Sequence, residues 1–348
     1  MLAGAARPPM LAGAAQPRMP ASAARPRLVE PLSGETRLML RAAQLYYRLN
    51  LTQDQVGDRL GVSRFKVGRL LDRALRESAV RIEIIHPAAR LVELEDALTD
   101  RFGLGGAVVV DVASTGSEQD DELLARERVA GAAVVHLASL QPTGAIGVSW
   151  GRTMLEVAAH LRQGWTAATE IVQLNGATSR SARPTRAHEI VERFGATSGA
   201  AIRLMAAPAI VGTPGLRDAL EQDPSVGETL AAARAAQTAV FSMGVLGPES
   251  VHVASGYLGE TDLAALEEAG AVGDILGRFV TRDGRIALPS LDRRTIGLPL
   301  EELRAKALTI GVVAGAGRGP IALAALRVGC VRVLVTDEAT ASWALDHA

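Results

Sequence analysis

The segment LTQDQVGDRLGVSRFKVGRLL, residues 51–71, has the spacing of a helix-turn-helix. Thr52 is expected to cap a first helix, with Gln55 three residues later completing a capping box. Gly61 allows the positive φ that a tight turn between two helices needs, and Ser63 is expected to cap the second helix. The spacing therefore predicts a small module whose second helix can enter a DNA major groove.

The predicted second helix, residues 64–77, has two faces of different polarity. An inward apolar face is formed by Val67, Leu70, Leu71 and Ala74, and the basic residues that point to solvent are Arg64, Lys66, Arg69 and Arg73. One amphipathic helix is predicted before the module from apolar residues at helical spacing, namely Leu38, Leu40, Ala42, Leu45, Tyr46 and Leu49. After the module, residues 80–85 alternate like a short strand and predict a wing.

Charge is divided unevenly along the chain. The formal net charge is −1, but residues 35–81 carry a net charge of +5 and residues 82–348 a net charge of −9. A basic segment is typical of proteins that neutralise DNA phosphates. The alternative is a helical hairpin whose basic face is merely solvated.

The DNA contacts follow from the placement of the second helix. Arg64 and Lys66 are expected near base edges or phosphates, while Gln53 and Arg69 hold the DNA backbone. Phe65 either touches a thymine methyl group or packs inside the module. The predicted DNA-binding set is Gln53, Ser63, Arg64, Phe65, Lys66 and Arg69.

Several classes of protein are excluded by composition. The single cysteine, Cys330, excludes a disulfide framework, and no apolar run approaches the ~20 residues that span a bilayer. We therefore expect a cytoplasmic protein without a membrane partner. Residues 1–34, rich in Ala, Pro and Arg, are expected to be a disordered tail or sequence upstream of the true start. A transit peptide is disfavoured because prolines interrupt any amphipathic helix.

Beyond residue 90, short β-branched runs alternate with helical patterns. Strands are predicted at 107–110, 145–148, 171–174, 239–245, 308–313 and 331–335. Helices are predicted at 118–140, 153–161, 226–236, 263–268 and 320–328. Repeated βα units with nearly continuous apolar strands predict an α/β domain with a doubly wound parallel sheet.

Five ordered stretches resemble the SorC family of bacterial sugar-responsive transcriptional regulators. They are RAAQLYYRLNLTQDQVGDRLGVSRFKVGRLL (41–71), IGVSWGRT (146–153), GAVGDILGRF (270–279), VAGAGR (313–318) and VTDEAT (335–340). The resemblance implies a helix-turn-helix DNA-binding domain at 35–87. It also implies an effector-binding and oligomerisation domain at 88–348, with a fold related to sugar-phosphate isomerases, deaminases and CoA-transferases. Dimers or tetramers on operator DNA, controlled by a small carbohydrate, are implied as well.

The loop after the strand at 145–148 is the first candidate for the effector site. Ligands of open parallel sheets lie beyond the carboxyl ends of the strands, and in the family this loop cradles the sugar or its phosphate. Trp150 is expected to stack on a sugar ring, and Arg152 can pair with a phosphate. Alternatively, Ser149 and Thr153 merely cap the following helix. The candidate residues of this loop are Gly147, Ser149, Trp150, Gly151, Arg152 and Thr153.

Two other motifs and one turn complete the predicted rim of the site. The family places an acidic ligand contact at Asp274, while Arg278 either contacts the ligand or pairs with Asp274. Gly315 and Arg318 lie between a strand and a helix, where many relatives carry a lysine at the Arg318 position. Asn175, after the strand at 171–174, is either a contact or part of a turn.

The related enzyme folds raise the alternative of a sugar-phosphate isomerase or deaminase, with Asp274 or a histidine as the base. The six histidines lack the spacing of a metal pair, and His136 and His160 fall on helical faces that suit structural roles. We expect no catalytic residue, metal or cofactor. The expected function is a regulator of a carbohydrate or polyol operon. Its effector is either a phosphorylated sugar held by Arg152 and Arg318 or an unphosphorylated polyol or pentose on Trp150.

Overall fold

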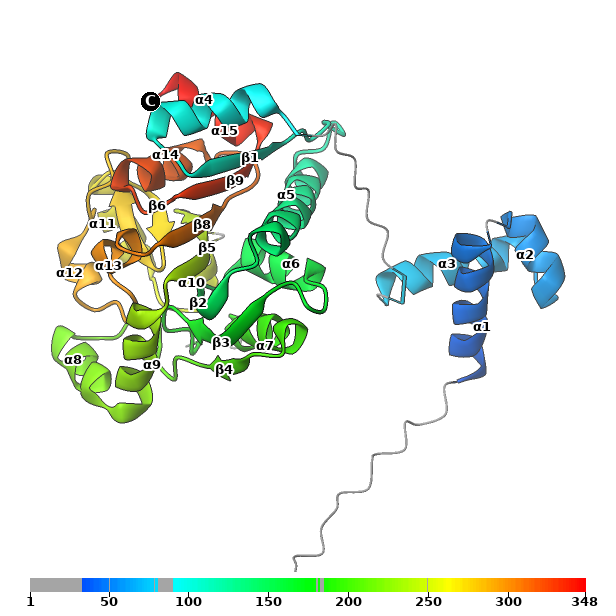
Figure 1. The fold of residues 1–348 in the computed structure, drawn as a ribbon, viewed down its shortest axis with the longest axis horizontal. Helices are drawn as coiled ribbons and strands as arrows, with labels where there is room; N and C mark the ends of the chain where they lie inside the picture. The colour runs from blue at the N-terminus through cyan, green and yellow to red at the C-terminus, as the bar shows by residue number, and fades with distance from the viewer. Residues whose placement is uncertain are drawn as a thin grey trace, which may run out of the picture. The chain divides into compact units, whose positions relative to one another are not determined.

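The chain folds into two compact units, one ending at residue 85 and the other beginning at His86 (Figure 1). The computed structural model describes residues 33–49, 51–77, 79–80, 90–179, 181, 185–248 and 250–348. Residues 1–32 of the predicted tail and residues 81–85 of the predicted wing lie outside the described residues. No helix of the described chain combines the length and the apolar composition that a membrane span requires.

The first unit is helical. Its elements are α1 (Gly34–Ala43), a π-helical turn η1 (Gln44–Arg48), α2 (Gln53–Leu60) and α3 (Arg64–Arg76). The predicted apolar face of α3 is confirmed, because all four of its residues are buried. The helix before the module differs from the prediction in two respects. Its buried residues are Met39, Ala42 and Ala43, and Leu49 is 59% exposed because the π-helical turn ends before it.

The turn between α2 and α3 has the predicted chemistry. The Thr52 hydroxyl accepts the Gln55 N–H at 3.3 Å and Gln55 Oε1 accepts the Thr52 N–H at 2.9 Å, which completes the capping box. Gly61 ends α2 with a φ of 66°, and the Ser63 hydroxyl accepts the Lys66 N–H. Sequence-local hydrogen bonds therefore fix the angle at which α3 leaves the turn.

The second unit is built on a sheet whose strands run in the order β1-β9-β8-β5-β2-β3-β4, all neighbours being parallel. A hairpin of β6 and β7 continues antiparallel from the end of β5. The strands are β1 (Gly106–Val110), β2 (Thr143–Val148), β3 (Ala167–Gln173), β4 (Ala201–Arg203), β5 (Thr238–Val245), β6 (Ala271–Ile275), β7 (Arg278–Thr281), β8 (Leu308–Val312) and β9 (Val333–Asp337).

Helices cover both faces of this sheet (Figure 1). Val108 and Val110 pack with α5, α6 and α7 in one apolar cluster, whereas Ala107 and Val109 pack with α4, α14 and α15 in the other. The helices are α4 (Val92–Phe102), α5 (Glu118–Leu140), α6 (Arg152–His160), α7 (Ala187–Ser198), α8 (Pro214–Gln222), α9 (Pro224–Ala235), α10 (Val251–Ala254), α11 (Glu260–Glu268), α12 (Pro289–Asp292), α13 (Leu300–Arg304), α14 (Gly319–Val328) and α15 (Glu338–Asp346). The predicted parallel α/β architecture is confirmed.

Each of the six predicted strands is present, but β4, β6 and β7 were not predicted. The motif at 270–279, for which no strand was predicted, forms the β6–β7 hairpin. Its pairing of Gly244 with Asp274 brings Asp274 beside the end of β5. The hairpin therefore places Asp274 at the carboxyl edge of the sheet.

Candidate functional site

A small cavity lies between β2 and β5, where the order in which the chain adds strands to the sheet reverses direction. From β2 the chain continues outward through β3 and β4, whereas from β5 it continues in the opposite direction through β8 and β9. Such a switch point between neighbouring parallel strands is where open α/β sheets bind ligands. The cavity measures about 40 Å³. We call it the central cavity; it is lined by residues 149–153, Asn175, residues 242–245, residues 250–252, Asp274, Leu276, Gly277 and Arg318.

The loop between β2 and α6 forms one wall of the central cavity. Ser149 accepts a hydrogen bond from the Ser242 N–H at 3.2 Å, which joins the ends of β2 and β5. Gly151 is the N-cap of α6, and no side chain caps this helix. The alternative that Ser149 and Thr153 cap the helix is therefore wrong. The first turn of α6 keeps backbone N–H groups available for an anion.

Trp150 is held as a fixed part of this wall. Its side chain is buried, and its indole Nε1–H donates to the Gly176 carbonyl at 2.9 Å. The ring centroid lies 5.4 Å from that of His252 and 6.4 Å from that of Tyr257. An aromatic surface thus borders the cavity, as the stacking prediction requires, and stacking on a ligand remains a prediction.

Asp274 and His252 form a buried pair that also lines the central cavity. The Oδ2 atom of Asp274 lies 3.1 Å from Nε2 of His252 and accepts the Gly277 N–H at 2.8 Å. Burial raises the pKa of the Asp274 carboxyl. The interaction with His252, the Gly277 N–H and the charge of Arg318 together outweigh burial, so the pKa lies below its usual value. Asp274 is therefore a carboxylate at neutral pH.

His252 is a site residue that the sequence did not reveal. It lies on α10, a helix of only four residues, and no motif or spacing singled it out. Its side chain is 5% exposed and lines the central cavity. His252 could not be singled out from the sequence, because a helix of one turn is too short to show a hydrophobic period.

Three buried polar atoms of the central cavity lack a hydrogen-bond partner among the described residues. They are Asn175 Oδ1, His252 Nδ1 and Arg318 Nε. Buried polar atoms in folded proteins are nearly always paired, so each unpaired atom requires an explanation. Three such atoms around one cavity offer hydrogen-bonding positions that a polar ligand can use.

The positive charge of the site comes from Arg318 and Arg152. Arg318 is buried, and its Nη2 atom lies 3.2 Å from Oε1 of Glu122. Burial lowers the pKa of Arg318, the Glu122 carboxylate raises it, and the neighbouring Arg152 lowers it further. Arg152 is exposed at the start of α6. Arg152 is the first residue of α6 and Arg318 is the N-cap of α14, and both guanidinium groups can bind an anion.

Three predicted residues lie away from the central cavity. The alternative that Arg278 pairs with Asp274 is wrong, because Arg278 binds Asp292 at 2.6 Å and the carbonyls of Gly297 and Leu298. Gly147 is buried in β2, where a Cβ would lie 2.3 Å from Cδ2 of Leu174. Gly315 donates its N–H to Asp337. It borders a separate hollow of about 620 Å³ beside α5 and α15.

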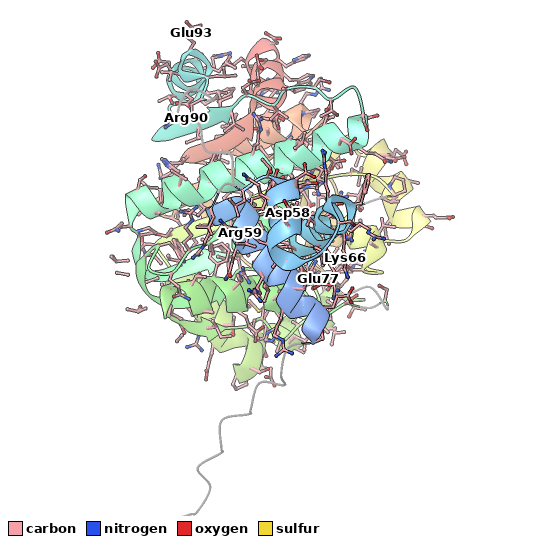
Figure 2. All side chains as sticks on the ribbon, turned by 90° about the vertical axis from the view of Figure 1, so that its right-hand side faces the viewer. Asp58, Arg59, Lys66, Glu77, Arg90 and Glu93 are labelled. Carbon is pink, nitrogen blue, oxygen red and sulfur yellow. The ribbon has the colours of Figure 1, made fainter. Side chains whose placement is uncertain are left out.

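The first unit presents a polar surface at the start of α3. Arg64, Phe65, Lys66 and Arg69 are exposed, and Gln53 is half-buried (Figure 2 labels Lys66). Phe65 is 83% exposed, so the alternative that it packs inside the module is wrong. Arg73 pairs with Glu35 and Glu77, and Nη1 of Arg64 lies 3.6 Å from Oδ2 of Asp54. The exposed residues are those predicted to contact DNA.

Comparisons with a family model and with known proteins agree on the family of this chain. Residues 86–346 match the family model described as "Putative sugar-binding domain". The chain is 30% identical to the deoxyribonucleoside regulator of Bacillus subtilis over 305 residues, which is 88% of this chain and 96% of that protein. It is also 30% identical to the transcriptional regulator LsrR of Klebsiella pneumoniae over 313 residues, covering 88% and 92% of the two chains.

Solved structures agree with this family. The full-length sorbitol operon regulator SorC of Klebsiella pneumoniae matches with a TM-score of 0.62 and 25% identity, covering 90% of this chain and 100% of that chain. A DeoR family transcriptional regulator from Listeria monocytogenes matches with a TM-score of 0.64 and 25% identity, covering 73% of this chain and 98% of that chain. The chain therefore belongs to the SorC family of transcriptional regulators with a sugar-binding domain.

Proposed function

We propose that this protein regulates a carbohydrate or polyol operon by binding operator DNA through α3 and a sugar effector in the central cavity. The main support for effector binding is the set of three unpaired buried atoms around one cavity at the switch point of the sheet. The exposed basic start of α3 supports the DNA half.

The central cavity favours a phosphorylated sugar over a free one. Arg318 and Arg152 form a donor side, and Asn175 Oδ1 and Asp274 form an acceptor side. A phosphate fits the donor side, and sugar hydroxyls fit the acceptor side. An unphosphorylated polyol or pentose stacked on Trp150 is the second candidate, and the buried indole in the wall favours it.

The size of the cavity connects effector binding to regulation. A volume of about 40 Å³ is far below the ~300 Å³ at which pockets begin to hold small ligands. We infer that the effector binds a more open arrangement of the walls. A ligand that binds one arrangement better than another shifts the population toward it. Such a shift is what changes the affinity of an oligomeric regulator for its operator.

We infer that the protein acts on DNA as a homodimer or homotetramer and has no catalytic role. A symmetric oligomer suits an operator with two half-sites. An isomerase or deaminase has no use for a helix-turn-helix, and the relatives compared above carry regulator names. Incubation with ribose 5-phosphate and glucosamine 6-phosphate should therefore leave both sugars unchanged by NMR. Conversion of either sugar would favour the enzyme.

The test of the DNA half is a gel-shift assay with the full chain and the DNA upstream of its own operon. The double change Arg64→Ala and Lys66→Ala should weaken binding at least tenfold and flatten its salt dependence. Arg76→Ala is the matched control because Arg76 is exposed near the end of α3, ~18 Å along the helix from Arg64. Equal effects of the double change and the control would contradict the proposal.

The test of the effector half uses the same assay with sugars added. Asp274→Ala should abolish the response to the effector and leave DNA binding without effector unchanged. An unaltered response in this variant would remove Asp274, and with it the central cavity, from the effector site.

A further inference from the structure

We propose that His252 determines the specificity of the central cavity by accepting a hydrogen bond from an effector hydroxyl at its Nδ1 atom. This proposal rests on the proposed function, since it assigns a ligand contact to the proposed effector site. It also identifies one chemical feature of the effector, a free hydroxyl group that contacts His252.

The first step concerns which ring nitrogen carries the proton. Nε2 of His252 lies 3.1 Å from Oδ2 of Asp274. A carboxylate can only accept hydrogen bonds, so Nε2 must be the protonated nitrogen. In a neutral imidazole the other nitrogen, Nδ1, is then an acceptor. Asp274 thus selects the tautomer of His252.

The second step concerns the freedom of the ring. The centroids of Trp150 and Phe279 each lie 5.4 Å from that of His252, and the Tyr257 centroid lies at 6.2 Å. A Cβ on Gly277 would lie 3.5 Å from Cε1 of His252. Aromatic rings therefore hold the imidazole on several sides. Turning the ring to pair Nδ1 elsewhere would break the hydrogen bond to Asp274.

The third step concerns the missing partner. Nδ1 of His252 is buried and has no hydrogen-bond partner among the residues that the structure describes. Asn175 Oδ1, another acceptor, is unpaired at the same cavity. Two acceptors beside the Asp274 carboxylate require donors from the ligand and repel a phosphate or carboxylate group. The hydroxyl-bearing end of a sugar meets this requirement.

The fourth step concerns selectivity. A site built to bond a hydroxyl discriminates strongly against an analogue that lacks it, because a buried polar atom is left unpaired. A deoxy analogue that lacks the hydroxyl facing His252 should bind roughly tenfold more weakly or worse. A site that merely encloses the sugar would show no such difference.

The first experiment determines the tautomer by ¹⁵N NMR of the histidine rings in the full chain without effector. The His252 signals are assigned by their loss in His252→Gln. The expected result is a protonated Nε2 and an unprotonated Nδ1. A protonated Nδ1, whether Nε2 is unprotonated or also protonated, would overturn the proposal before any ligand is identified.

The second experiment measures binding by calorimetry with matched sugars. The compounds are ribose 5-phosphate with its 2-deoxy and 3-deoxy analogues, and glucose 6-phosphate with its 2-deoxy, 3-deoxy and 4-deoxy analogues. Wild type should prefer one parent sugar at least tenfold over one of its deoxy analogues. His252→Gln retains an amide that can reach Asp274 but has no nitrogen at the Nδ1 position, so it should lose this preference.

His160→Gln is the matched control. His160 is also buried, its Nδ1 already bonds the Glu156 carbonyl at 2.9 Å, and it does not line the central cavity. This variant should keep the wild-type preference. Melting curves and operator binding without effector show whether each variant is folded, and His252→Phe provides a second variant that retains an aromatic ring.

The outcomes separate the two proposals. If wild type binds a sugar but His252→Gln and His252→Phe keep the full preference, the role of His252 is wrong and the effector site stands. Equal binding of every parent and deoxy sugar by wild type also contradicts the role of His252. If wild type binds none of these sugars, the proposed effector class fails, and the role of His252 fails with it.

Discussion

Arg318 Nη2 lies 3.2 Å from Oε1 of Glu122, and the same oxygen accepts a 2.7 Å hydrogen bond from Arg126. One carboxylate oxygen thus serves two guanidinium groups. Burial raises the pKa of Glu122, but Arg126, Arg318 and Arg152 outweigh it, so the pKa is lowered. The surplus positive charge beside the central cavity is only partly neutralised by the protein itself. The phosphate of the proposed phosphorylated effector would supply negative charge at this position.

Arg318→Ala should weaken the binding of a phosphorylated sugar by roughly 10- to 100-fold, because hydrogen bonds to charged groups contribute ~1.5–3 kcal/mol. The unphosphorylated form of the same sugar should lose much less. Calorimetry with both forms measures the difference. Arg126→Ala is the control, since Arg126 shares Glu122 but does not line the cavity. Equal losses for both forms would show that Arg318 does not bind the phosphate.

Asp274 should make stability depend on pH in the acid range. Its pKa is lower in the folded state than in the unfolded chain, where a carboxyl of this type titrates near ~3.9. The stabilisation is therefore fully present above the unfolded pKa and is lost as the pH falls through the folded pKa. Acid unfolding followed by circular dichroism should show a smaller loss of stability for Asp274→Asn than for wild type. Parallel acid curves for both proteins would contradict this reasoning.

Phe65 and Leu70 should behave in opposite ways, although both lie on α3. Phe65 is 83% exposed, so Phe65→Ala should change the free energy of unfolding by only about 0.5 kcal/mol. It should nevertheless weaken operator binding. Leu70 is buried, and Leu70→Ala should cost ~2–5 kcal/mol. Denaturant melts and gel shifts on the same preparations test both changes. A large stability loss for Phe65→Ala would show that it packs against the protein.

Gly57 should tolerate no side chain. A Cβ at this position would lie 2.7 Å from the Val62 carbonyl oxygen, which belongs to the backbone of the turn. Gly57→Ala should therefore shift α2 against α3, destabilise the first unit and reduce operator binding. Gly34→Ala is the control, because a Cβ at Gly34 meets nothing within 4 Å. Thermal melts of the two variants should differ, with a lower midpoint for Gly57→Ala.

The helix-turn-helix was predictable because its determinants are local. Thr52, Gln55, Gly61 and Ser63 act on backbone groups within a few residues of themselves, and the structure shows each in its predicted place. The predicted strands of the parallel sheet were also found, since each is a short apolar run between turn residues. Local chemistry and burial pattern therefore determine most of the architecture.

The central cavity was only partly predictable because its contacts join distant segments. The loop after β2, Asp274, Asn175 and Arg318 were named from motifs, and all line the cavity. His252 was missed, since its partner Asp274 lies 22 residues away and meets it only through the β6–β7 hairpin. Neither of the two alternatives weighed for Arg278 named its partner Asp292, for a similar reason. Asp292 is brought to this arginine by tertiary packing, which the hydrophobic pattern of the sequence does not show.

Trp150 has a consequence for how this protein can be observed. Of its three tryptophans, Trp150 borders the central cavity, whereas Trp165 packs against Phe194 and Trp343 stacks on His347. A ligand entering the cavity changes the surroundings of one indole and leaves the other two as an internal reference. Intrinsic fluorescence therefore gives the chain a built-in optical signal of occupancy that needs no attached dye.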